Sequence, residues 1–189
     1  MDKYEYEILK LNKTLNKFSY GTYENNKIVD IYPEFHTLPL SSVLTYKVGC
    51  CWELTLLAAT YFSTFLPQIK YKLYYYQTEK YETHTWLAYK YNNKIIIFES
   101  AWKQYQGLHS YKNEKEMLND YSKKLYDSND YKNTNWFICT WTKFIANRLN
   151  VCEFIGILLY NSSFVMGNRK IYTNTRNLSL ATQSVKMFL

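Results

Sequence analysis

"VGCCWELTLLAATYF", residues 48–62, places two adjacent cysteines after a glycine and directly before an apolar segment. From Cys51 onward, apolar side chains recur at helical spacing as far as Phe65, and Pro67 then ends the segment. We therefore expect the central, most buried helix of the fold to begin at Cys51. The start of a helix offers free N–H groups and partial positive charge, which favour a thiolate. Cys51 is the candidate nucleophile, whereas Cys50 is expected to point elsewhere, as a packed thiol or as half of a redox-active pair.

The sequence after this helix predicts an antiparallel sheet. Three segments rich in aromatic and β-branched residues follow one another, at residues 71–77, 83–91 and 94–100. The predicted fold class is α+β, with the cysteine-bearing helix packed on the sheet. The other expected elements are a helix over residues 3–18 behind an Asp2 cap, a short helix from Ser41 or Ser42 through Lys47 ended by Gly49, a helix over residues 114–126, a strand over residues 136–141 and a short buried helix over residues 151–160.

The register of one hairpin brings an imidazole close to a carboxylate. Residues 92–93 are both asparagine, which tolerates the positive φ of a two-residue hairpin loop. Counting back from this loop places Trp86 opposite Glu99 and His84 opposite Ala101. His84 and Glu99 then share one face of the sheet as diagonal neighbours, within reach of a side-chain hydrogen bond. A loop of odd length would place them on opposite faces.

A nucleophilic thiolate also needs a base, normally histidine, that a third polar group orients. The chain has three histidines; His36 and His109 lie in loop contexts, so His84 is the candidate base and His109 the alternative. Glu99 lies in an otherwise apolar strand, where a carboxylate is costly unless it is paired. We interpret Glu99 as the orienting group, with an exposed edge-strand residue as the alternative. Glu53 is expected to be a first-turn acid that favours the helix dipole.

The composition limits the class of protein. The chain has 189 residues, which fits one main domain over residues 1–160 and a polar, irregular extension over residues 161–189. This extension could be a pairing strand, an occluding segment or disorder. No signal peptide or membrane span is recognisable, and four cysteines without zinc spacing predict reduced thiols, so we expect a cytoplasmic protein with no metal or cofactor. The net charge of +7 and the 21 tyrosines leave nucleic-acid binding as a minor alternative, because the lysines are scattered and the three arginines lie apart.

These residues together resemble a known family. The G-C-C-W sequence before an apolar helix, H-T-W in a strand and F-E-S-x-W after the hairpin are similar to the transglutaminase-like branch of the papain-like cysteine peptidase superfamily, in particular to small bacterial and phage proteins. The similarity covers roughly residues 40–111 and extends weakly to residue 160. By position, the resemblance implies Cys51 as nucleophile, His84 as base and acid, and Glu99 as orienting carboxylate. The family more usually has aspartate at the third position, and the only oxyanion donor we can name is the generic one, the backbone N–H of Cys51.

The resemblance implies a cysteine-dependent acyl-transfer enzyme that hydrolyses a peptide, isopeptide or side-chain amide bond. Deamidation and transamidation remain open, and the expected partner is a protein or peptide substrate. Trp52, Trp86 and Trp102 are candidate substrate-binding residues, because an aromatic lid would exclude water from the thiolate; Trp52 and Trp86 are most simply core residues. The alternative from another class is a catalytically inactive member of the family that binds a protein partner through its tyrosine-rich surface.

Overall fold

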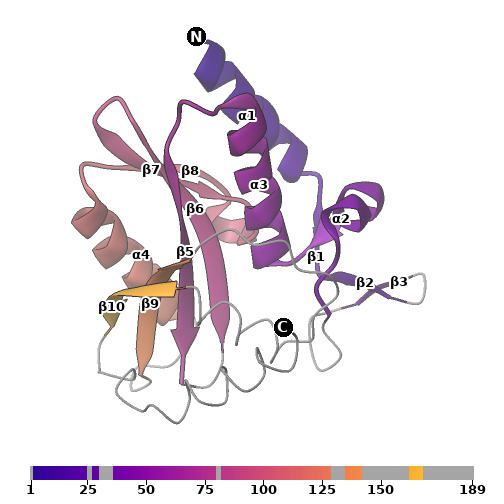
Figure 1. Ribbon diagram of the computed structural model, residues 1–189. Helices are drawn as coiled ribbons and strands as arrows, with labels where there is room; N and C mark the ends of the chain where they lie inside the picture. The colour runs from indigo at the N-terminus through magenta and orange to yellow at the C-terminus, as the bar shows by residue number, and fades with distance from the viewer. Residues whose placement is uncertain are drawn as a thin grey trace.

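The computed structural model describes residues 2–24, 27–29, 36–79, 82–128, 135–141 and 162–167 (Figure 1). This part of the chain is a mixed α+β structure with four α-helices and a six-stranded antiparallel sheet in the order β10-β9-β5-β6-β7-β8. In chain order the elements are α1 (Lys3–Leu15), β1 (Ser19–Tyr20), β2 (Thr22–Glu24), β3 (Lys27–Val29), α2 (Leu40–Tyr46), β4 (Val48–Gly49), α3 (Cys51–Phe65), β5 (Tyr71–Thr78), β6 (Thr83–Tyr91), β7 (Lys94–Glu99), the 3₁₀-helix η1 (Lys103–Tyr105), β8 (Gly107–Tyr111), α4 (Glu114–Ser128), β9 (Trp136–Trp141) and β10 (Ser162–Gly167).

Helices cover both faces of the sheet, with α1 and α3 on one side and α4 on the other (Figure 1). Alternate residues of β5 divide between the two faces: Leu73 and Tyr75 join the core under α3, and Tyr74 and Tyr76 join the core under α4. This is the period of two that a β-strand imposes. Because both faces are buried, the central strand is apolar or aromatic at every one of these positions.

The central helix α3 begins and ends where the sequence predicts. Its N-cap is Cys50, whose backbone is extended (φ −87°, ψ −178°), and its last residue is Phe65, two positions before Pro67. Burial extends around most of the helix, and Ala58 and Phe62 have no exposed surface. A helix that is apolar on nearly all sides is stable only inside a core. The predictions of a buried central helix and of the strands that follow it are confirmed.

The short helix α2 differs from its predicted limits. Its N-cap is Pro39 rather than Ser41 or Ser42, and the Pro39 carbonyl accepts hydrogen bonds from the backbone N–H groups of Ser42 and Val43. The helix ends because Lys47 takes the left-handed conformation (φ 52°), not because of the glycine that follows. Gly49 instead lies in β4, where an added Cβ would come within 3.3 Å of side chains on α2 and α3. Helix α1 similarly ends at Leu15, before the predicted limit of residue 18, although Asp2 caps it as expected.

The sheet extends beyond the predicted domain limit at residue 160. Ser162–Gly167 forms the edge strand β10, which pairs with β9 and is bulged between Phe164 and Met166. Of the roles considered for the C-terminal extension, a pairing strand therefore applies to these six residues. The predicted buried helix at residues 151–160 lies outside the described residues. Within the described ranges, the structure contains no helix of the length and apolarity needed to span a bilayer.

Candidate active site

Cys51 is the first residue of α3, and the packing of this helix against β6 sets the position of its thiol. The residue is almost fully buried, with 6% of its surface exposed. Thr55, one turn further along α3, donates a hydrogen bond from its hydroxyl to the Thr85 carbonyl at 3.1 Å and so ties the helix to the strand. This contact places the helix start beside the end of β6 that carries His84.

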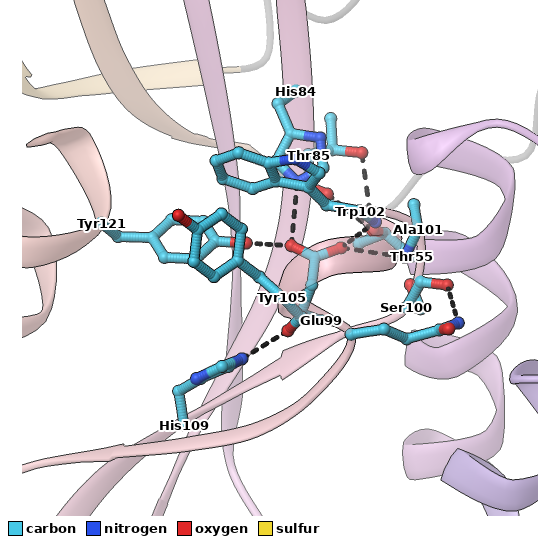
Figure 2. A network of polar contacts seen from close by, with 11 residues as sticks. Thr55, His84, Thr85, Glu99, Ser100, Ala101, Trp102, Tyr105, His109 and Tyr121 are labelled. Atoms are coloured by element: carbon cyan, nitrogen blue, oxygen red, sulfur yellow. Dashed lines mark hydrogen bonds and ion pairs between the residues drawn. The ribbon is translucent and has the colours of Figure 1, made fainter. Parts of the chain in front are cut away.

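The hairpin has the predicted register. Asn92 and Asn93 both adopt positive φ (48° and 59°), and the β6–β7 pairing runs from Tyr91 opposite Lys94 inward to Leu87 opposite Phe98. The two strands continue past the last of these pairs, so His84 and Glu99 lie close to each other near their ends. A hydrogen bond of 2.9 Å joins His84 Nε2 to Glu99 Oε2 (Figure 2). The imidazole is 11% exposed and the carboxylate has no exposed surface, which excludes the alternative of a surface glutamate.

Four donors surround the Glu99 carboxylate (Figure 2). Oε1 accepts hydrogen bonds from the backbone N–H groups of Ala101 (2.8 Å) and Trp102 (2.9 Å), and Oε2 accepts from His84 and from the Tyr121 hydroxyl. Hydrogen bonds to an ionised acceptor are roughly twice as strong as neutral ones. The buried carboxylate is thus fully paired, and it fixes the proton of neutral His84 on Nε2. Nδ1 is left as the ring nitrogen that faces the thiol.

The electrostatics of the site favour a thiolate and an imidazolium. The side-chain interaction with Cys50 outweighs the opposing effect of burial and, together with His84 and Thr85, holds the pKa of Cys51 well below its ordinary value. Burial alone would lower the pKa of His84, but the Glu99 charge and the hydrogen bonds with Cys51 and Glu99 raise it to about 10. The two shifts have the same origin, because each charged group stabilises the other. Both shifts favour an ion pair of thiolate and imidazolium, the state in which a cysteine acts as a nucleophile.

Cys50 does not point away from its neighbour as the sequence analysis expects. As the N-cap, its side chain folds back over the first turn, where its thiol lies beside Cys51 and donates its one proton to Glu53 Oε2 at 2.5 Å. Burial raises the pKa of the Cys50 thiol well above its ordinary value, so this sulfur stays protonated. It is a packed thiol, as predicted, and its contact with Cys51 lowers the pKa of the Cys51 thiol.

Glu53 has a larger role than a first-turn acid. It is buried, and its two oxygens accept hydrogen bonds from the backbone N–H groups of Cys50 (2.9 Å) and Leu38 (2.8 Å), which closes a capping box with the residue before the helix. Burial raises the pKa of this carboxyl to about 7, against the lowering effect of these bonds. Glu53 thus holds the start of α3, and with it the Cys51 backbone, in place.

A pair of substitutions at Cys50 tests its effect on the Cys51 thiol. We expect Cys50→Ala to slow the alkylation of Cys51 at about pH 6 by roughly tenfold, because losing the polar side chain beside the thiolate raises the thiol pKa by about one unit or more. Cys50→Ser keeps a donor and an N-cap side chain, so its alkylation rate should stay within about threefold of wild type. The measurement is the rate of iodoacetamide modification of Cys51 by mass spectrometry. Equal rates for wild type and Cys50→Ala would contradict the role.

The three tryptophans occupy different environments. Trp52 (2% exposed) and Trp86 (0%) are core residues, the simpler of the two interpretations made from the sequence. Trp86 stacks on Tyr74 with ring centroids 5.4 Å apart and also lies against the His84 ring. Trp102 is half-buried, packs edge-on against His84 at 5.7 Å and lines a cavity of about 490 Å³ that opens beside the imidazole. Of the three, Trp102 is the one that lines this cavity.

Two tyrosines of the site were not identified from the sequence. Tyr121 lies on the helix predicted at residues 114–126, and its hydroxyl reaches Glu99 on the face of the sheet opposite to α3. Tyr20 lines the same cavity as Trp102 and is a neighbour of Cys51. No local pattern marks either one, because both contacts depend on tertiary packing. The sequence predicts a loop at His109, the alternative base, but this residue lies in β8, and its Nε2 contacts the Tyr105 carbonyl.

Comparison with known protein families and with curated proteins finds no match for this sequence. Among the described residues, no group of three or more histidine, cysteine, aspartate or glutamate side chains is arranged to hold a metal ion.

Proposed function

We propose that this protein is a cysteine-dependent acyl-transfer enzyme. In this proposal Cys51 is the nucleophile, His84 the general base and acid, and Glu99 the carboxylate that orients the imidazole. The observation that carries it is the position of His84, whose ring is hydrogen-bonded to a buried, fully paired carboxylate and is electrostatically coupled to the Cys51 thiol at the start of α3. A nucleophile, a base and an orienting group within hydrogen-bond reach are the geometric signature of covalent catalysis.

The proposed reaction passes through a thioester. The Cys51 thiolate attacks the carbonyl carbon of an amide, and the carbonyl oxygen takes up the negative charge. When the tetrahedral intermediate collapses, the C–N bond breaks and His84 gives its Nδ1 proton to the departing amine. Water then loses a proton to His84 and attacks the thioester, which releases a carboxylic acid and restores the thiolate. Water is the default acceptor, so we favour hydrolysis of a peptide, isopeptide or side-chain amide bond.

The arrangement of elements supports the same proposal. A helix that carries the cysteine at its first position packs on an antiparallel sheet, and neighbouring strands supply the histidine and the acid. This is the arrangement implied by the resemblance to the transglutaminase-like branch of the papain-like peptidases. We propose that the chain has this fold and takes a protein or peptide as substrate.

The pH dependence of alkylation tests the proposal on the intact protein. Because the Cys51 pKa is lowered and the His84 pKa is raised to about 10, the ion pair should persist across the neutral range. We expect the rate of iodoacetamide modification of Cys51 to change less than about threefold between pH 6 and 8, whereas an ordinary thiol with a pKa near 8.5 gains about tenfold per pH unit. Cys139, which is fully buried in β9, provides the internal comparison and should react only after unfolding. A tenfold rise per unit at Cys51 would favour a binding module over an enzyme.

A further inference from the structure

Tyr20 lies beside the segment that leads into the nucleophile. Strand β1 pairs in parallel with β4, with Tyr20 opposite Gly49, two residues before Cys51. Hydrogen bonds on either side of Tyr20 hold this register: the N–H of Ser19 donates to the Lys47 carbonyl at 2.8 Å, and the N–H of Gly21 donates to the Gly49 carbonyl at 3.4 Å. The backbone thus fixes the tyrosine next to the start of α3.

The Tyr20 hydroxyl contacts two groups of Cys51. The side chain and the backbone of Cys51, at the start of α3, are both polar neighbours of the hydroxyl and act on its pKa. Tyr20 also lines the cavity that His84 and Trp102 border. Burial of the hydroxyl, together with the neighbouring Cys51 charge, raises the Tyr20 pKa above its ordinary value, so the group keeps its proton.

We propose that the Tyr20 hydroxyl is the second donor of the oxyanion hole and acts with the backbone N–H of Cys51. The inference rests on the proposed function, because it concerns the oxygen of the tetrahedral intermediate. In the resting site the hydroxyl donates to the anionic sulfur and accepts from the Cys51 N–H. When the thiolate attacks a carbonyl, negative charge passes from the sulfur to an oxygen two bonds away. Once that oxygen lies between the hydroxyl and the N–H, both groups donate a hydrogen bond to it. The hydroxyl thus changes its acceptor from the sulfur to the oxyanion.

Two reagents that attack the same sulfur separate this role from others. Iodoacetamide reacts at a saturated carbon and forms no oxyanion, whereas p-nitrophenyl acetate acylates the sulfur through a tetrahedral oxyanion and releases p-nitrophenolate. Loss of one oxyanion donor slows acyl transfer by about a hundredfold or more. We therefore expect Tyr20→Phe to lower the rate of Cys51 acylation by about a hundredfold, while the alkylation rate at about pH 8 changes less than about threefold. Acylation and alkylation are measured on the folded full chain by mass spectrometry of Cys51.

The other outcomes overturn the proposal. If Tyr20→Phe accelerates both reactions, the hydroxyl is a cap that blocks the site; if it slows both equally, it only positions the thiolate; if it changes neither, it has no role in the chemistry. Tyr23→Phe is the matched control, since this tyrosine lies on the following strand and stacks on Tyr46. Failure of the proposed function is distinguishable, because the wild-type protein would then lack the flat pH dependence of Cys51 alkylation.

Discussion

Replacing His84 by alanine is expected to slow the alkylation of Cys51 at about pH 6 by roughly a hundredfold. Without the imidazolium, the thiol pKa returns toward about 8.5, and the thiolate fraction at this pH falls to roughly one in three hundred. A thiolate of higher pKa is intrinsically more nucleophilic, which offsets part of that loss. The rates of the variant and of wild type should converge above about pH 9, where any thiol is ionised. The measurement is the pH–rate profile of Cys51 modification between these limits.

Two further variants separate the chemistry of His84 from its packing. His84→Gln fills the space between Trp86 and Trp102 and can still donate to Glu99, but it cannot carry the positive charge or accept a proton from sulfur. It should therefore lose alkylation at low pH as His84→Ala does. His109→Ala, which removes the histidine that contacts the Tyr105 carbonyl, should keep the wild-type profile. A wild-type profile for both His84 variants would exclude this residue as the activating base.

The parts of the site that could be predicted are those that local sequence determines. The two asparagines at positions 92 and 93 set a two-residue loop, and the loop sets the register of the strands on both sides. Since side chains alternate along a strand, that register alone places His84 and Glu99 on one face. The helix start at Cys51 is equally local, because glycine before it and an uninterrupted apolar segment after it define where the helix begins.

The parts that could not be predicted depend on contacts between distant segments. Strand β1 has two residues, too few for a periodic pattern, and it pairs with β4 only because α1 and α3 pack together in the same core. The hydroxyl of Tyr121, on α4, reaches Glu99 on the face of the sheet that α4 covers, a contact that no spacing within either element encodes. The direction of the Cys50 side chain was also predicted wrongly, although it depends on local structure. An N-cap side chain folds back over the first turn, but cysteine is too rare at the N-cap for the sequence to indicate this.

Glu99→Gln is expected to reduce acyl transfer by about a thousandfold to ten-thousandfold while leaving the protein folded. The carbonyl oxygen of the new amide can still accept from the backbone N–H groups of Ala101 and Trp102, but the amide NH₂ then faces His84 Nε2. To accept from this NH₂, the imidazole must carry its proton on Nδ1, the nitrogen that faces the sulfur. That tautomer cannot take a proton from Cys51; a comparable tautomer trap in serine proteases costs about ten-thousandfold in kcat.

The stability and the pH profile of the variants at this position distinguish orientation from packing. Glu99→Ala leaves His84 without its counter-charge and leaves the backbone N–H groups of Ala101 and Trp102 without an acceptor. It should therefore lower the free energy of unfolding, measured in urea, by about 3–5 kcal/mol. Glu99→Gln should have a free energy of unfolding closer to that of wild type. Its alkylation of Cys51 should be slow at about pH 6 and recover above about pH 9, where the thiol ionises without a base.

Glu114→Gln is the matched control, because Glu114 also accepts from a tyrosine hydroxyl, that of Tyr74, but pairs with Lys72 at the surface. It should leave the alkylation profile unchanged and lower the free energy of unfolding by less than about 1 kcal/mol. If Glu99→Gln alkylates at about pH 6 as fast as wild type, the carboxylate supports the fold alone, and the pairing of Cys51 with His84 must be sufficient to form the thiolate.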